Sequence, residues 1–257
     1  MRTFGLIGNP ISESLSPSFF QKKFEAEDIK DAVYQLFPLK SIADLPLLIE
    51  NEKALVGLNV THPYKETVLP YMNQLTPAAQ AIGAVNTIRI HRAGGRIVLT
   101  GHNTDCEGFG LLLDHINTPI PEHALVLGTG GAAKAVAYTL AQRSICYTFV
   151  SRSAGKNRLT YNDITADIIQ RNPLIINATP VGMGAECNAC LPLPYSAITP
   201  QHILIDLIYR PEVTTFLQKG KAQGASTFNG LSMLIGQAEA SWHFWQEKNE
   251  SCAIASV

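Results

Sequence analysis

The sequence predicts an α/β fold in two domains, an N-terminal α/β domain followed by a domain built on a parallel sheet. Apolar runs of strand length alternate with helical segments through almost the whole chain of 257 residues. In the second half these runs are apolar throughout, which is typical of parallel strands covered by helices on both faces. A glycine-rich turn at residues 128–133 joins one such run to a helix.

The composition indicates a globular protein and argues against a nucleic-acid or membrane partner. Hydrophobic residues make up 46% of the chain and charged residues 16%, which leaves enough apolar surface for a core. The net charge of −1 and the lack of a Lys/Arg run argue against nucleic acid. No apolar run is long enough for a membrane span, and the N-terminus turns polar too early for a signal peptide. Five scattered cysteines fit a reducing environment, so we expect a cytoplasmic protein.

Two of the cysteines, Cys187 and Cys190, form a CxxC pair in a loop-like segment. Such a pair can be half of a zinc site or a redox pair. Zinc needs about four ligands, however, and no second CxxC is present. We therefore favour two loop thiols and expect no metal site.

The first half of the chain predicts strands and helices in alternation. Ser16 as N-cap and Pro17 at the first helical position predict a helix over residues 17–26. Thr76 and Pro77 begin a short helix in the same way. The other expected elements are strands at 4–8, 33–39 and 54–60, a helix at 42–51, and a hairpin over 84–103 that turns at 93–95.

The second half predicts a sheet with helices between its strands. After a helix at 105–116, the expected strands are 123–127, 146–152, 174–180 and 202–209, with helices after the glycine turn, at 213–224 and at 231–248. The pattern changes near residues 103–105. We therefore expect one domain of residues 1–103, completed by the C-terminal helix 230–257, and a second domain of residues 104–229.

The glycine turn is the pattern G-x-G-x-x-(G/A) between a strand and a helix. Gly128 permits the tight turn, Gly130 lets the backbone approach a pyrophosphate, and Ala133 lets the helix pack close to the strand. The N-terminus of the helix also favours negative charge. A glycine turn that serves packing alone is the alternative. We predict a dinucleotide site in a Rossmann-type domain.

The end of the next strand indicates which dinucleotide binds. An NAD site usually carries Asp or Glu about 20 residues after the glycine turn, but this chain has Ser151, Arg152 and Ser153 there, followed by Lys156. The two cations could bind a 2′-phosphate and the serines could donate hydrogen bonds to it. A solvated basic loop is the alternative. The missing carboxylate favours NADP.

A nicotinamide enzyme that oxidises an alcohol needs a group that takes the hydroxyl proton. Lys65 follows a strand and a proline, at a strand end, where ligands bind in open α/β sheets. Asp105 opens a helix at the domain boundary and could hold a lysine in place. Taken alone, each has an ordinary explanation, a solvated lysine and an acid that favours the helix dipole.

Eight motifs in order resemble the shikimate dehydrogenase family over nearly the whole chain. They are GNPISESLSP, NVTHPYK, GAVNT, NTD, GTGGAA, NATPVGM, DLIYRPEVT and NGLSMLIGQA. The resemblance implies an enzyme of aromatic amino acid biosynthesis that reduces 3-dehydroshikimate to shikimate with NADPH. It implies that the first domain binds the substrate and that the second, Rossmann-type domain binds NADP.

The resemblance also implies a role for each matching residue. The catalytic pair would be Lys65 and Asp105. The substrate would be bound by Ser14 and Ser16 at its carboxylate, by Asn59, Thr61, Asn86 and Gln237 at its hydroxyls, and by Tyr209. NADP would be bound by Gly128, Thr129, Gly130, Gly131, Ala132, Ser151, Arg152, Lys156, Thr179 and Gly230.

The chain departs from the family pattern at four places near these residues. Glu13 stands where histidine is common, His62 where an apolar residue is usual, and Cys106 where glycine is frequent. Ser151 replaces the usual asparagine of the 2′-phosphate clamp. None of these departures removes a predicted catalytic group.

Two other functions stay open, and so does the oligomeric state. One is a quinate/shikimate dehydrogenase that prefers NAD. An Asp or Glu after the second strand of the cofactor domain would favour this function, and neither is present there. A non-catalytic ligand-binding relative would be expected to lose Lys65 or Asp105, and both are present. The chain could act as a monomer or a homodimer.

Overall fold

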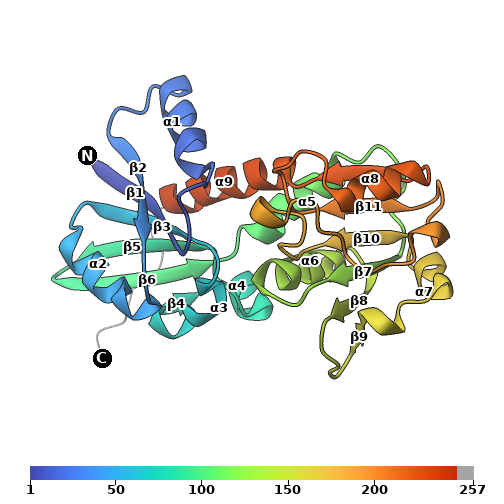
Figure 1. Cartoon of the computed structure of the whole chain (residues 1–257). Coiled ribbons are helices and arrows are strands. Elements are labelled where there is room, and N and C mark those ends of the chain that lie inside the picture. The colour runs from blue at the N-terminus through green and yellow to red at the C-terminus, as the bar shows by residue number, and fades with distance from the viewer. Residues whose placement is uncertain (248–257) are drawn as a thin grey trace. The chain divides into compact units, whose positions relative to one another are not determined.

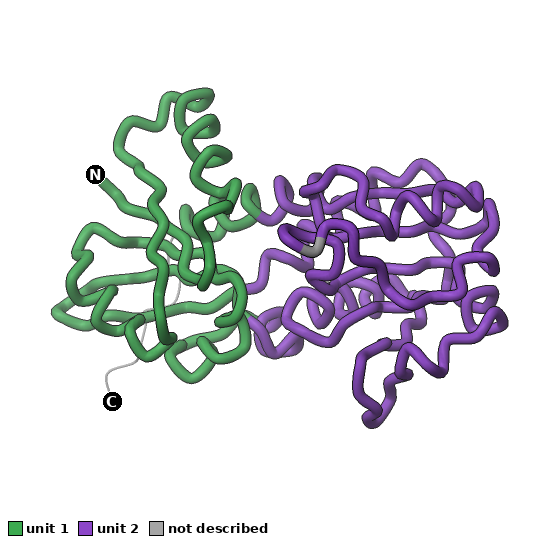
Figure 2. The backbone as a smooth tube through the Cα atoms, in the orientation of Figure 1, with its two compact units in different colours: residues 1–76, 85–102, 238–257 green, residues 77–84, 103–237 purple. Residues whose placement is uncertain are grey.

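Within residues 1–247, which the computed structural model describes, the chain forms two six-stranded sheets, one in each of two units (Figure 1). The first unit comprises residues 1–76, 85–102 and the segment from residue 238 on, and the second comprises 77–84 and 103–237 (Figure 2). The sequence-based boundary lies between residues 103 and 104. The units differ from it in that residues 77–84, 103 and 230–237 group with the second unit. Part of the predicted C-terminal segment, residues 248–257, lies outside the described residues.

The sheet of the first unit has the strand order β2-β1-β3-β5-β6-β4. The strand β1 is parallel to β2 and β3, whereas β3 pairs antiparallel with β5, and β5 with β6. The expected hairpin turns at Gly94 and Gly95, both with positive φ, a backbone conformation that suits a two-residue hairpin turn. The strands are β1 (Arg2–Gly8), β2 (Ala32–Pro38), β3 (Leu55–Val60), β4 (Gln74–Leu75), β5 (Thr87–Ala93) and β6 (Arg96–His102).

The helices of the first unit cover an aromatic core. Phe4 of β1 packs with Phe20 and Phe24 of one helix and with Trp242 and Trp245 of another. These large rings bury much apolar area, which is the main stabilising contribution in such a core. The elements are α1 (Ser16–Ala26), η1 (Ile42–Asp44), α2 (Leu45–Asn51), α3 (Tyr64–Thr67), η2 (Leu69–Tyr71) and the C-terminal part of α9 (Leu231–Gln246).

The sheet of the second unit has the order β12-β11-β10-β7-β8-β9, and its neighbouring strands pair in parallel. This confirms the parallel sheet expected from the sequence. The strands are β7 (His123–Leu127), β8 (Cys146–Ser151), β9 (Arg158–Thr160), β10 (Leu174–Asn177), β11 (Ile203–Asp206) and β12 (Ser226–Asn229). The helices are α4 (Pro77–Ile82), α5 (Asp105–Asp114), α6 (Gly131–Gln142), α7 (Ala166–Arg171), α8 (Thr215–Ala222) and the first part of α9, with short turns η3 (Tyr161–Asp163), η4 (Gly184–Glu186) and η5 (Tyr195–Ala197).

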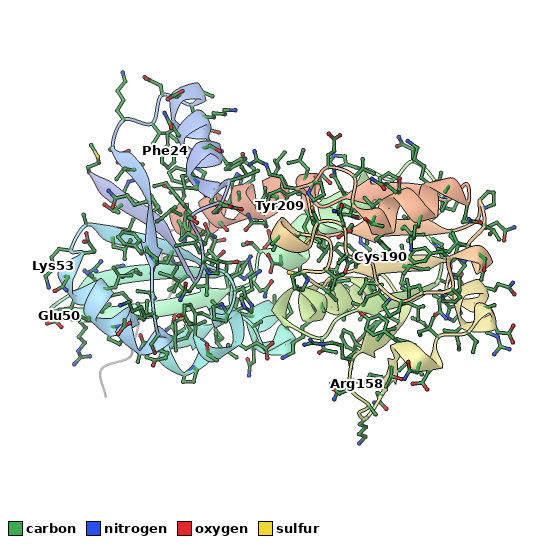
Figure 3. All side chains as sticks on the ribbon, in the orientation of Figure 1. Phe24, Glu50, Lys53, Arg158, Cys190 and Tyr209 are labelled. Carbon is green, nitrogen blue, oxygen red and sulfur yellow. The ribbon has the colours of Figure 1, made fainter. Side chains whose placement is uncertain are left out.

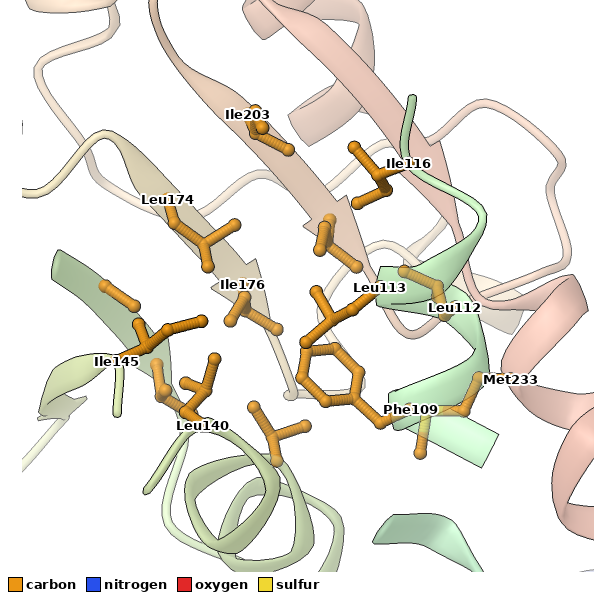
Figure 4. Close-up of a cluster of buried hydrophobic side chains, with 14 of the residues drawn as sticks. Phe109, Leu112, Leu113, Ile116, Leu140, Ile145, Leu174, Ile176, Ile203 and Met233 are labelled. Atoms are coloured by element: carbon orange, nitrogen blue, oxygen red, sulfur yellow. The ribbon is translucent and has the colours of Figure 1, made fainter. Parts of the chain in front are cut away.

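Both faces of this sheet are buried. Val126 of β7 and Ile176 of β10 belong to the cluster that contains Phe109 of α5 (Figure 4). Their neighbours on the same strands, Leu127 and Ile175, belong to a separate cluster with α7 and α8. Because successive side chains of a strand point to opposite faces, this explains why the strands are apolar at every position.

Among the described residues, none of the helices combines the length and the apolar character needed to cross a membrane.

We expect Phe109→Ala to lower the free energy of unfolding by about 3–5 kcal/mol, because it empties a fully buried site. Leu111 lies on the same helix but is 44% exposed, so Leu111→Ala should cost less than about 1 kcal/mol. Urea titrations followed by circular dichroism measure both values. Equal losses would contradict the packing of α5 through Phe109.

Candidate active site

Two serines lie where the chain enters α1. The backbone N–H of Ser16 donates to Ser14 Oγ, and the two hydroxyl oxygens are 3.2 Å apart. The prediction that Ser16 caps this helix is wrong, because Ser16 is its first residue and Leu15 takes the N-cap position. The hydroxyls still lie at the N-terminus of an 11-residue helix, where negative charge is favoured. Glu13 is exposed beside them.

Three of the four residues predicted to bind the ring hydroxyls, Asn59, Thr61 and Asn86, belong to the first unit and lie close to the carboxyl end of β3. The backbone N–H of Val60 donates to the carbonyl of Asn86 at 2.7 Å, which places Asn86, the residue just before β5, beside the end of β3. Both amides are buried, whereas Thr61 is half-buried and its N–H donates to the carbonyl of Ile7. Parallel strands β1 and β3 end here, and such edges are where open α/β sheets bind ligands.

Lys65 belongs to the same edge of the first unit. It lies on the short helix α3, is half-buried, and its carbonyl accepts the N–H of Val85 at 2.7 Å. This backbone bond ties α3 to the residue that precedes Asn86. His62 lies just before this helix, is exposed, and its carbonyl accepts the N–H of Asn9.

Asp105 is the first residue of α5 in the second unit and is 5% exposed. Its backbone N–H donates to Asn103 Oδ1 at 3.2 Å, and Asn103 Nδ2 donates to the carbonyl of Ala84 at 2.9 Å. Asn103 is fully buried and fixes the start of the helix. The carboxylate of Asp105 is thus carried by a rigid element, as a catalytic or positioning group requires.

Cys106, where the family often has glycine, is a helical and buried residue here. Its Sγ lies 3.0 Å from the carbonyl of Asn103. Burial, and then the nearby carboxylates of Glu107 and Asp105, raise the pKa of Cys106 to about 12. The thiol therefore stays neutral and unreactive near neutral pH.

Gly128 and Gly130 of the glycine turn differ in their backbone conformation. Only Gly128 adopts a positive φ, which favours glycine. Gly128 has φ +107°, and a side chain there would come within 3.1 Å of the Ala178 carbonyl and of the methyl group of Thr179. Gly130 is the N-cap of α6 with extended backbone, and an added Cβ would meet nothing within 4 Å. The space beside Gly130 fits a pyrophosphate at the helix N-terminus. The other turn residues, Thr129, Gly131 and Ala132, are half-buried.

The loop after β8 is basic at its surface. Arg152 and Lys156 are exposed, whereas Ser151 is buried and its hydroxyl donates to the carbonyl of Ser153 at 2.6 Å. The Ser151 side chain therefore shapes the loop, and the two cations are the groups presented to solvent.

A buried network holds the loops that carry Thr179 and Tyr209. Asp206 ends β11 and accepts hydrogen bonds from Asn177 Nδ2, from the N–H of Ile208 and from Thr214 Oγ1. The Asn177 Oδ1 in turn accepts from the N–H and the hydroxyl of Thr179 at 3.0 and 2.7 Å.

This network is not predicted from the sequence, although the sequence contains one signal for it. Asn177 and Asp206 are polar residues that end otherwise apolar strands, and both are fully buried. Burial raises the pKa of Asp206, and the hydrogen bond from Thr214 opposes that rise. Polar side chains at such positions organise the loops that follow them.

Of the remaining predicted residues, Tyr209 follows β11, Gly230 lies between β12 and α9, and Gln237 lies on α9. Tyr209 is half-buried, and burial raises its pKa (Figure 3). Gly230 has a packing reason to be glycine, since an added Cβ would lie 2.0 Å from the Leu207 carbonyl oxygen. Gln237 is half-buried, and its Nε2 donates to the carbonyl of Leu234 at 3.0 Å.

The CxxC cysteines are free thiols. Cys187 is exposed, and Cys190 Sγ lies 2.9 Å from the Tyr195 hydroxyl (Figure 3). Within the part of the chain that is described, His, Cys, Asp and Glu side chains do not gather in a group that could hold a metal.

Comparison with known proteins places the chain in a family. Residues 6–88 match the family model for the shikimate dehydrogenase substrate binding domain. The NADP-dependent shikimate dehydrogenase of Clostridium beijerinckii is 38% identical, over 96% of this chain and 93% of that protein. The chain belongs to the shikimate dehydrogenase family. The resemblance seen in the sequence is thereby confirmed.

Solved structures of the family confirm the fold class. Shikimate 5-dehydrogenase from Thermus thermophilus, solved with NADP(H) and shikimate, matches with a TM-score of 0.81 and 32% identity, over 96% of this chain and 94% of that one. Quinate dehydrogenase from Corynebacterium glutamicum, solved with NAD, matches with a TM-score of 0.83 and 28% identity, over 95% and 93%.

We expect Gly130→Ala to raise the KM for NADP by about tenfold or more, which corresponds to about 1.4 kcal/mol of lost binding. The fold has space for the methyl group, so the melting temperature should stay within about 2 °C of the wild type. Gly128→Ala is the matched comparison and should lower the melting temperature, because φ is +107° there. A Gly130→Ala variant with an unchanged KM would show that this space is not a cofactor site.

Proposed function

We propose that this protein catalyses the reversible, NADPH-dependent reduction of 3-dehydroshikimate to shikimate in aromatic amino acid biosynthesis, the chorismate pathway. The observation that carries this proposal is its similarity, over nearly its whole length, to NADP-dependent shikimate dehydrogenases. The first unit would bind the substrate and the second would bind NADP.

The side chains of the first unit suit a hydroxylated carboxylic acid. Ser14 and Ser16, at the N-terminus of α1, would hold the carboxylate. Thr61, Asn59 and Asn86 would recognise the ring hydroxyls, because hydroxyl and amide groups can both donate and accept hydrogen bonds. From the second unit, Tyr209 and Gln237 would complete the substrate contacts.

The residues of the second unit fit NADP. Bound NADP would supply the hydride acceptor, and NADPH the hydride donor in the reverse direction. The turn at Gly128–Ala132 would hold the pyrophosphate at the N-terminus of α6. Arg152 and Lys156, helped by the loop that Ser151 shapes, would bind the 2′-phosphate, while Thr179 and Gly230 would border the nicotinamide.

Lys65 and Asp105 are proposed as the catalytic pair. Lys65 would take the proton from the reacting hydroxyl and return it to the carbonyl in the reverse direction. Asp105 would lie beside the same hydroxyl and fix the position of the lysine by accepting a hydrogen bond from its amine. The pair is retained in this chain, which disfavours a non-catalytic ligand-binding relative.

A quinate/shikimate dehydrogenase that uses NAD is the second candidate. The likeness to the Corynebacterium quinate dehydrogenase favours it. The exposed cations after β8 and the missing carboxylate favour NADP instead.

We also propose that the protein works in the cytoplasm, where its cysteines would stay reduced. Its partner would be the small-molecule substrate, and it would act as a monomer or a homodimer.

The deciding experiment is a spectrophotometric assay of shikimate and quinate, each with NADP and with NAD. We expect the highest kcat/KM for shikimate with NADP. Preferential turnover of quinate with NAD would support the second candidate. A shikimate-induced melting shift without any absorbance change at the nicotinamide band would support a non-catalytic protein.

We expect Lys65→Ala to lower kcat by about 10²–10⁴-fold with little change in the KM for shikimate, since general acid–base groups typically contribute this much. Lys53→Ala is the control, because Lys53 is an exposed lysine of the same unit (Figure 3) and should leave both constants unchanged. Steady-state kinetics measure both. A rise in KM alone would mean that Lys65 binds the substrate without taking the proton.

We expect Arg152→Ala to raise the KM for NADP by about tenfold or more and to leave any activity with NAD unchanged, because a charged hydrogen bond to the 2′-phosphate is lost. Arg171 is an exposed arginine of the same unit, so Arg171→Ala controls for the loss of one positive charge. An equal effect on both cofactors would contradict the assignment.

A further inference from the structure

Tyr34 is a half-buried tyrosine of the first unit to which the sequence assigns no role. It lies on β2, and its ring stacks on Phe20 of α1 with centroids 4.4 Å apart and planes 12° apart. The Trp245 ring of α9 is also close, with its centroid 6.5 Å from that of Tyr34. The ring is therefore held by packing, and its hydroxyl has a fixed position.

The Tyr34 hydroxyl faces two of the residues predicted to bind the substrate. It donates to Asn59 Oδ1 at 2.8 Å. The Ser16 side chain also interacts with it. Burial raises the pKa of Tyr34 and the Ser16 hydroxyl opposes the rise, so the phenol stays protonated and able to donate.

The other side of the Asn59 amide is held as well. Asn59 Nδ2 donates to Ser241 Oγ at 2.9 Å and to Thr87 Oγ1 at 3.2 Å. The Thr87 hydroxyl donates to Asn86 Oδ1 at 3.1 Å, and the hydroxyl oxygens of Ser241 and Thr87 lie 2.8 Å apart. With its oxygen on a phenol donor and its nitrogen on two hydroxyl oxygens, the amide has one favourable orientation.

Hydrogen bonds lead through the first unit from Tyr34 to Asn59 and on through Thr87 to Asn86. Ser16, which is paired with Ser14, acts electrostatically on the Tyr34 hydroxyl at the start of this series. Ser14 and Ser16 would hold the substrate carboxylate, and Asn59 and Asn86 would bind its ring hydroxyls. Tyr34 is the link between the two groups.

We propose that Tyr34 is a positioning residue that couples the carboxylate end of the substrate site to its ring-hydroxyl end. Ser241 supports the same arrangement from α9. The inference rests on the proposed function, because it concerns how that substrate is held. It does not make Tyr34 a contact of the substrate.

Tyr34→Phe is the direct test, since it keeps the packed ring and removes only the hydroxyl. We expect the KM for shikimate to rise about three- to tenfold, the net effect of losing one partly buried hydrogen bond. The KM for NADP should stay within about twofold, because the change lies in the first unit. Tyr64→Phe is the matched control: Tyr64 is buried in the same unit and its hydroxyl donates only to the Leu39 carbonyl among the contacts described for it, at 2.7 Å. It should lose comparable stability without a change in either KM.

A double-mutant cycle separates coupling from a merely structural effect. The double variant Tyr34→Phe/Ser16→Ala is compared with the two single variants. If Tyr34 acts through Ser16, the double variant's fold-increase in the KM for shikimate should be at least about threefold smaller than the product of the two single fold-increases. Independent, multiplicative effects would overturn the inference, as would an unchanged KM for shikimate in Tyr34→Phe.

Ser241→Ala keeps the inference testable if Tyr34→Phe does not fold. It removes one acceptor of the Asn59 amide and should raise the KM for shikimate about two- to threefold, again without affecting NADP. An unchanged KM there would overturn the inference. A wild-type protein that neither oxidises shikimate nor is stabilised by it would overturn the proposed function and this inference together, whereas an active wild type with indifferent variants would overturn only the inference.

Discussion

A polar side chain buried at the end of an apolar strand must find hydrogen-bond partners, and both units of this protein depend on that constraint. An unsatisfied buried amide or carboxylate costs on the order of 1–3 kcal/mol, more than a typical hydrogen bond contributes. Asn59 meets the constraint in the first unit, and Asn177 and Asp206 meet it in the second. In each case at least one partner lies on a segment distant in sequence and others lie in the adjoining loops, so satisfying the polar group also fixes those loops.

The apolar parts of the strands make this arrangement possible. In the second unit, helices cover both faces of the parallel sheet, so its middle is dry and rigid. The loops at the carboxyl ends are then the places where polar atoms can face a ligand. Rigid strands with polar ends are a sound base for a site whose geometry must be held closely.

Much of the fold could be predicted because its signals are local. Apolar runs marked β1, β3, β7, β10 and β11, and the glycine turn marked the start of α6. The short elements β9, β12 and α7 escaped prediction, since three to six residues with few apolar side chains carry little periodic signal. The N-terminus of α1 was misassigned by one residue because Ser14, and not Ser16, accepts the local backbone hydrogen bond.

The candidate site was predictable mainly by resemblance, and its supports were not. Asn59 could be named from its motif, but its partner Ser241 lies 182 residues away along the chain. Glycines illustrate the same limit. Gly130 and Gly230 are both glycine in the sequence, yet their surroundings differ. A side chain at position 130 would meet open space, whereas one at position 230 would clash with the Leu207 carbonyl. Only the surroundings of each residue distinguish room for a ligand from a packing constraint.

The aromatic core of the first unit gives the protein a built-in optical probe. The chain has two tryptophans, Trp242 and Trp245, and both belong to that core. Trp245 also donates from Nε1 to the Ile88 carbonyl at 3.0 Å. Tryptophan emission therefore reports on the first unit alone, while most of the helical circular dichroism comes from the second. Recording both signals during unfolding would tell whether the two units lose their structure in one step or in succession.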